Sequence, residues 1–134
     1  MNKSQVAIEF VITIGISVFM LFIFVAIIHE ETIKFNRERE LVLVEDLAAT
    51  LQREFIVAES VNNGYTRTFK IPENLLGINF TIFAQSQELV VRSVHYESVA
   101  ALPKDINNVA SLKKGFNTIK KEKGVICLNN NTCP

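Results

Sequence analysis

An unbroken apolar run near the start of the chain constrains its fold more than any other feature. No charged residue occurs from Phe10 to Ile28, and at about 1.5 Å per residue a helix of this length can cross a hydrocarbon core about 30 Å thick. The apolar part of a secretory signal peptide is shorter, about 7 to 15 residues, and ends at a small-residue cleavage site. A buried helix of a soluble protein is the other alternative. The length of the run favours one membrane-spanning helix.

Charge and cysteine use indicate on which side of the membrane the rest of the chain lies. Lys3 precedes the span, and Glu30 and Glu31 follow it, so the positive-inside tendency predicts a cytoplasmic N-terminus and an extracellular C-terminal domain. The only cysteines, Cys127 and Cys133, lie close together. A disulfide is typical of such a pair in an exported domain, and a metal site would require further ligands nearby. Asn79 and Asn130 each begin a glycosylation sequon, which has meaning only in an exported chain.

Helical periodicity extends beyond the span. From Gln5 to about Val61 there is no proline and Gly15 is the only glycine, so nothing interrupts one long helix before Asn62-Asn63-Gly64 ends it. Its outer half has apolar residues at three- and four-residue spacing. We therefore predict an α+β fold of the following parts: an apolar helix at 5–29, an amphipathic helical stem at 30–62, and an exported antiparallel β-domain at 63–134 that packs on the stem.

Alternation and turn residues predict the strands of this β-domain. A small sheet must bury one face, and the amphipathic stem is the available partner. The predicted strands are 66–71, 78–83, 89–94 with 96–101 as its continuation after a bend, 116–120 and 125–128, the last two forming a hairpin. The predicted shared core is Val44, Leu47, Leu51, Phe55, Phe69, Phe80, Ile82, Val90 and Phe116.

The composition argues against several functions. The formal net charge is zero, whereas nucleic-acid-binding proteins usually carry a basic face. His29 and His95 are the only histidines, and neither is placed beside a nucleophile. The sequence has no glycine-rich phosphate loop and no cluster with metal-ligand spacing. We expect no enzyme, no catalytic residue, no metal and no cofactor.

Glu9 is the only charged residue from Gln5 to Ile28. A carboxylate at the margin of a membrane span is costly unless it has a partner, which makes it a functional hypothesis. The alternative is a side chain that reaches back to water at the cytoplasmic interface.

The segment KSQVAIEF, running directly into the apolar span, resembles the class III signal peptides of archaeal type IV pilin-like proteins. In that family a short basic leader ends before a glutamine, with a small residue two positions later and a glutamate four positions later. The matching positions here are the leader 1–4, Gln5, Ala7 and Glu9. Ser4 stands where glycine is frequent in the family, and Ala7 where serine is frequent. The later segments LAATLQREFIVAESVNNG and KKGFNTIKKEKGVICLN are also compatible with the small exported domains of these proteins.

The resemblance implies that a prepilin peptidase cleaves between Ser4 and Gln5 and that pilus assembly machinery builds the subunits into a surface filament. It implies further that the new α-amine of Gln5 pairs with Glu9 of an adjacent subunit. The expected partners are the membrane, the peptidase, the assembly machinery and identical or related pilin subunits, without nucleic acid. The alternative function is a single-pass membrane-anchored extracellular binding or sensor protein that does not polymerise.

Overall fold

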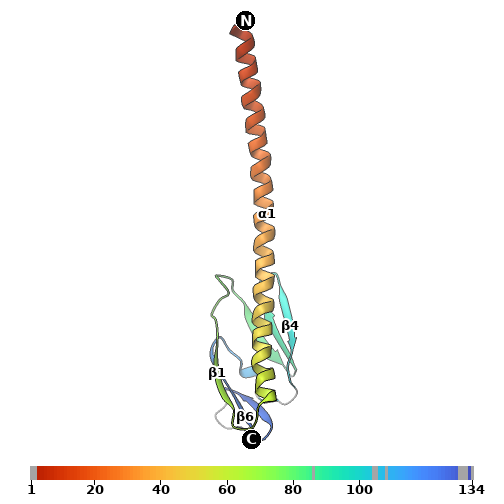
Figure 1. The fold of residues 1–134 in the computed structure, drawn as a ribbon, viewed down its shortest axis with the longest axis vertical. Coiled ribbons are helices and arrows are strands. Elements are labelled where there is room, and N and C mark those ends of the chain that lie inside the picture. The colour runs from red at the N-terminus through yellow and green to blue at the C-terminus, as the bar shows by residue number, and fades with distance from the viewer. Residues whose placement is uncertain (1–2, 86, 104–105, 108, 130–132, 134) are drawn as a thin grey trace. The chain divides into compact units, whose positions relative to one another are not determined.

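The computed structural model describes residues 3–85, 87–103, 106–107, 109–129 and 133. In these residues one long helix, α1, is followed by seven strands and a short 3-10 helix, η1 (Figure 1). The chain divides into two compact units, Met1–Glu38 and Arg39–Pro134. The second unit contains the C-terminal part of α1 together with all the strands, and the two units are described separately.

α1 (Lys3–Ser60) is 58 residues long, which confirms the long helix predicted from Gln5 to about Val61. Its end lies at the predicted stop. Gly64 adopts a left-handed φ of +94°, a conformation that costs glycine little. Lys121 Nζ donates hydrogen bonds to the backbone oxygens of Glu59 and Val61. A cation at the C-terminus of a helix satisfies free carbonyl groups and interacts favourably with the helix dipole.

The strands form two sheets. In the first, the order is β1 (Thr66–Ile71), β6 (Gly115–Glu122), β7 (Val125–Leu128) and β5 (Ile106–Asn107). Its pairs are antiparallel except for the parallel pair of β5 with β7. In the second, β2 (Thr81–Gln85), β3 (Glu88–Arg92) and β4 (Glu97–Ala101) pair antiparallel in sequence order. The predicted α+β class is confirmed. The strands form two sheets in place of the single sheet predicted from the sequence.

Side chains from the outer half of α1 and from both sheets form one core. In Figure 1, β1 and β4 lie on either side of this part of the helix. The helix contributes residues at three- and four-residue spacing, which places them on one face. These residues are Val44, Leu47, Ala48, Leu51, Phe55 and Ala58. The sheets contribute Ile71, Ala84, Leu89, Val91, Ile119, Ile126 and Leu128, and the connection before β2 contributes Phe80.

Two residues of the predicted core lie elsewhere. Phe116 is 67% exposed, because Asn117 and Ile119 take the inward positions of β6 and the two-residue period of a strand turns Phe116 outward. Val90 is buried but does not join the core cluster, since Leu89 and Val91 occupy the inward positions of β3. The prediction is confirmed for the four helix residues and for Phe80. Phe69 and Ile82 are partly buried and pack against the cluster.

The strands differ most from the sequence prediction at two places. Strand 78–83 was expected, but β2 begins at Thr81 because Leu75 and Ile78 form an isolated antiparallel bridge around the left-handed Gly77. Segment 96–101 does not continue the preceding strand. It reverses direction at Ser93, whose amide donates to the Tyr96 carbonyl at 2.8 Å, and returns as β4. The predicted hairpin between β6 and β7 is present, with positive φ at Lys123 and Gly124, as a type I′ turn requires.

Candidate functional site

The residues predicted to act in processing and assembly lie at the start of α1. Ser4 and Gln5 are both helical. Gln5 and Glu9 are exposed and four residues apart, so their side chains project from the same face of the helix. The backbone oxygen of Glu9 accepts a hydrogen bond from Thr13 Oγ1 at 2.8 Å. Among the described residues, the Glu9 side chain makes no hydrogen bond or ion pair. The carboxylate is therefore available to a group from outside the chain.

The residues that follow Glu9 along α1 are mostly apolar, and their side chains are exposed. From Gln5 to Glu38 every residue is exposed, including Phe10 at 65% and Phe24 at 64%. None of the most apolar stretch is buried within the described chain, whereas the core helix of a soluble protein is mostly buried. In the described part of the chain, α1 is the one helix long and apolar enough to cross a membrane. Leaving this surface in water would cost about 25 cal/mol per Å², and such a surface is typical of a segment that lipid or other helices cover.

The apolar segment is continuous with the core helix of the second unit. Val44 and Phe55, both 0% exposed, belong to the same helix as the candidate membrane span. Cleavage directly after the span, as for a secretory signal peptide, would cut through α1. Cleavage between Ser4 and Gln5 would instead leave almost the whole helix attached to the β-domain.

The second unit contains a buried carboxylate that no local sequence pattern indicates. Glu40 is the first buried residue along α1, at 8% exposure. Its Oε2 lies 3.0 Å from Nδ1 of His95, and its Oε1 accepts a hydrogen bond from the His95 amide at 3.4 Å. A hydrogen bond from Ser93 and these contacts to His95 hold the pKa of Glu40 below its ordinary value. Glu40 thus connects the β3–β4 turn to α1 through hydrogen bonds.

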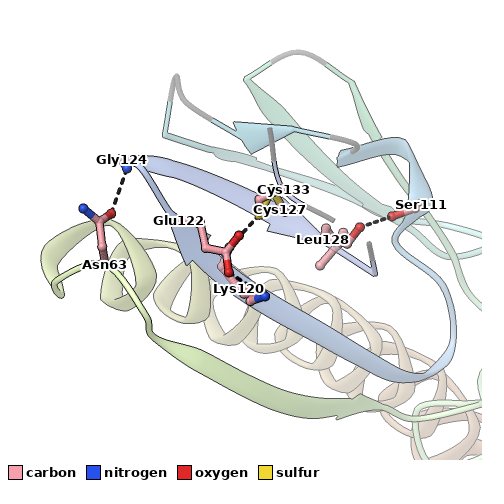
Figure 2. The surroundings of a disulfide bond; sticks show 8 residues. All are labelled: Asn63, Ser111, Lys120, Glu122, Gly124, Cys127, Leu128 and Cys133. Carbon is pink, nitrogen blue, oxygen red and sulfur yellow. Dashed lines mark hydrogen bonds and ion pairs between the residues drawn. A yellow bond between two sulfur atoms is a disulfide. The ribbon is translucent and has the colours of Figure 1, made fainter. Parts of the chain in front are cut away.

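Cys127 and Cys133 form a disulfide with a Cα–Cα distance of 5.9 Å. Figure 2 shows Cys127 on strand β7 of the β6–β7 hairpin, near the Lys120–Glu122 ion pair. In the same view the side chain of Asn63 accepts a hydrogen bond from the amide of Gly124 at 2.8 Å, and the Ser111 hydroxyl donates to the Leu128 carbonyl at 2.9 Å. These contacts join the hairpin turn to the segment that follows α1, and the strand β7 to η1.

The remaining predicted positions are placed as follows. Asn79 is exposed in the connection before β2, where a sequon is accessible. Asn130 lies outside the described residues. His29 is exposed on α1, 66 positions before His95 in the chain. Within the described ranges, no three His, Cys, Asp or Glu side chains gather as metal ligands would.

Comparisons of the chain with protein-family models, curated proteins and solved structures find no match.

Proposed function

We propose that this protein is a structural subunit, major or minor, of an archaeal type IV pilus-like surface filament. The observation that carries the proposal is α1 itself. The segment from Gln5 to Ile28 is apolar and exposed, with Glu9 as its one carboxylate four residues after Gln5, and the outer half of the helix contributes to the core of a β-domain. A helix of this kind can be covered by lipid before assembly and by neighbouring helices after it. A structural role of this kind involves no catalytic residue, metal or cofactor.

The proposed sequence of events begins with a single-pass protein whose N-terminus is cytoplasmic and whose β-domain is extracellular. A prepilin peptidase cleaves between Ser4 and Gln5, and the assembly machinery moves the helix from lipid into a filament core. In that core an isolated carboxylate would be strongly destabilised without a positive partner. The α-amine created at Gln5 supplies this charge to Glu9 of an adjacent subunit. The ion pair fixes the axial position of one subunit against the next.

Replacement of Glu9 by Gln tests this role. The full chain is expressed in membranes that contain the peptidase and the assembly machinery, and sheared material is examined by electron microscopy. The variant should insert in normal amounts but lose its filaments, because the α-amine has no counter-charge. Glu38→Gln is the matched control, since Glu38 is an exposed carboxylate of the same helix outside the apolar run, and it should assemble normally. Normal filaments from Glu9→Gln would contradict the proposal.

A membrane-anchored binding or sensor protein is the second function, and the same exposed apolar helix supports it. In that case the wild-type chain remains in the membrane fraction, and shearing releases no filaments even when peptidase and assembly machinery are present.

A further inference from the structure

A shallow depression of about 380 Å³ opens in the second unit where β1 continues into the loop before β2. The residues that line it are Lys70, Pro72, Glu73 and Asn74. Lys70 pairs with Phe116 in the β1–β6 register and lies on the outer face of the sheet, since the next residue, Ile71, is buried. Its Nζ lies 5.5 Å from the centroid of the Phe116 ring, which is 67% exposed. An exposed aromatic ring therefore borders the depression.

The loop that lines the depression is held in place by hydrogen bonds. Lys114 Nζ donates to the Glu73 carbonyl at 3.0 Å, which connects the loop to the segment before β6. The Gly77 amide donates to Oδ1 of Asn74 at 3.2 Å. The amide NH₂ of Asn74 makes no hydrogen bond within the described ranges. It is available to donate to a ligand.

Two opposite charges line the depression without pairing with each other. Lys70 and Glu73 are both exposed, and in the part of the chain that the structure describes neither charged group makes a hydrogen bond or an ion pair. A Cβ placed on Gly115 would lie 4.0 Å from Oε1 of Glu73, so this carboxylate lies close to the residue that precedes Phe116. A ligand in the depression would meet an ammonium group, a carboxylate, an amide and an aromatic ring.

We propose that this depression binds an acidic sugar, a uronic acid residue of a cell-surface polysaccharide. The carboxylate of the sugar accepts a hydrogen bond from Lys70. Its hydroxyl groups donate to Glu73 and accept from the Asn74 amide, and its C–H groups pack against Phe116. Hydrogen bonds to ionised groups are about twice as strong as those between neutral groups. A few convergent polar groups beside an aromatic side chain are typical of a small-molecule site.

The charges favour a ligand that is both anionic and rich in hydroxyl groups. Residues 61–134 contain nine lysines and arginines but five aspartates and glutamates, although the whole chain has equal numbers of each sign. This part of the chain therefore attracts anions. A DNA strand or an acidic peptide would pair with Lys70 but would be repelled by Glu73, because neither has a row of hydroxyl groups to donate. A neutral sugar would leave Lys70 without a counter-charge.

Access to such a ligand rests on the proposed function, because the β-domain must lie outside the cell to meet a polysaccharide. Binding itself requires no filament. It is therefore measured on the full chain in detergent micelles, apart from any assembly.

Titration calorimetry with tetragalacturonate gives the first test. Its methyl ester is the matched probe, because it keeps the sugar rings and their hydroxyl groups but lacks the charge. The ester should bind about tenfold more weakly, as expected for the loss of one charge-assisted hydrogen bond. Oligodeoxythymidylate and tetraglutamate should bind no better than the ester. No binding of tetragalacturonate, equal binding of the ester, or binding of the DNA or the peptide as tight as that of tetragalacturonate would overturn the proposal.

Substitutions at exposed residues give the second test. Lys70→Gln should weaken the binding of tetragalacturonate about tenfold and leave that of the ester unchanged. Phe116→Ala should weaken the binding of both. Lys123→Gln removes an exposed lysine of the β6–β7 turn, and as the matched control it should change neither. Near-UV circular dichroism of each variant should match that of the wild type. Equal losses from Lys70→Gln and Lys123→Gln would contradict a specific site.

Glu73→Gln distinguishes this site from a surface that merely attracts anions. The neutral ester isolates the hydroxyl contacts, and its binding should weaken about fivefold because the hydroxyl groups lose a charged acceptor. On a surface that merely attracts anions, the same variant would leave the ester unchanged and bind tetragalacturonate more tightly. That result would overturn the proposal.

These measurements separate the failure of the sugar site from that of the proposed function. If the wild-type chain forms filaments but does not bind tetragalacturonate, the filament role remains and the sugar site is wrong. If it binds tetragalacturonate but forms no filaments, the sugar site remains and the filament role is wrong.

Discussion

The two units of this chain share one helix but surround it with different environments. In Met1–Glu38 every described residue from Gln5 onward is exposed, apolar side chains included. In Arg39–Pro134 the same helix buries Val44, Leu51 and Phe55 against two sheets. The first unit has apolar residues on all its sides and the second on one side mainly. The distribution of apolar residues around a helix therefore indicates whether its partner is the chain's own sheet or something outside the chain.

The largest effect is expected when one phenylalanine in each unit is replaced by alanine. Phe55→Ala should lower the free energy of unfolding by about 4 kcal/mol, because it leaves a cavity in a close-packed core. Phe24→Ala should leave it unchanged, since Phe24 is 64% exposed and has no partner in the fold. Urea unfolding of the full chain in detergent micelles, followed by near-UV circular dichroism, measures both. Both tyrosines, Tyr65 and Tyr96, lie in the second unit and report on it. Equal losses in the two variants would contradict the comparison.

A smaller effect is expected from the disulfide, which stabilises the second unit alone. Replacing Cys127 and Cys133 together by Ser should reduce the free energy of unfolding by about 2 kcal/mol, as the chain-entropy model gives for a short loop. Extraction of the chain from membranes should not change, because the first unit contains no cysteine. Reduction of the wild-type protein should reproduce the loss of the double variant. If the reduced protein and the variant kept wild-type stability, the disulfide would not support this unit.

The smallest effect on stability is expected from Glu40, which lies close to the sequence boundary between the two units. Glu40→Gln should lower stability at neutral pH by about 1 kcal/mol, because it weakens the hydrogen bonds to His95 and Ser93. Glu38→Gln, two residues earlier and exposed, should have no effect. In the wild-type chain the pKa of Glu40 is lowered by folding, so its contribution is present above about pH 4.5 and is lost as the pH falls through the lowered value. Urea unfolding at a series of pH values checks the sign. A Glu40→Gln variant as stable as the wild type at neutral pH would contradict this role.

The sequence predicted those features that depend on local pattern. The absence of proline predicted α1, alternation predicted β1 at 66–71, and Lys123-Gly124 lie within the predicted hairpin turn. Features that depend on distant partners were missed. Glu40 and His95 are 55 positions apart, and nothing near either residue signals the contact. Phe116 was assigned to the core by its hydrophobicity, but the inward position next to it belongs to Asn117, which is fully buried and bonded to Lys113 and Asn129.

The residues of the candidate site also fall into those that the local sequence indicates and those that only the fold reveals. The spacing of Gln5 and Glu9 is local, so the sequence was sufficient to propose a role for them, and the helix then placed both on one exposed face. The exposure of Val42 and Ile56 on the outer side of α1 became evident only after the fold showed which side of the helix is covered.

The most direct test of the account is the mass of the intact protein isolated from its native membrane or from filaments. The proposed function requires a chain that begins at Gln5 and retains the whole apolar segment, because the positive partner of Glu9 is created by that cleavage. A mass lacking residues 1–4 and nothing more is the expected result. A retained Met1, or cleavage after Ile28, would contradict it.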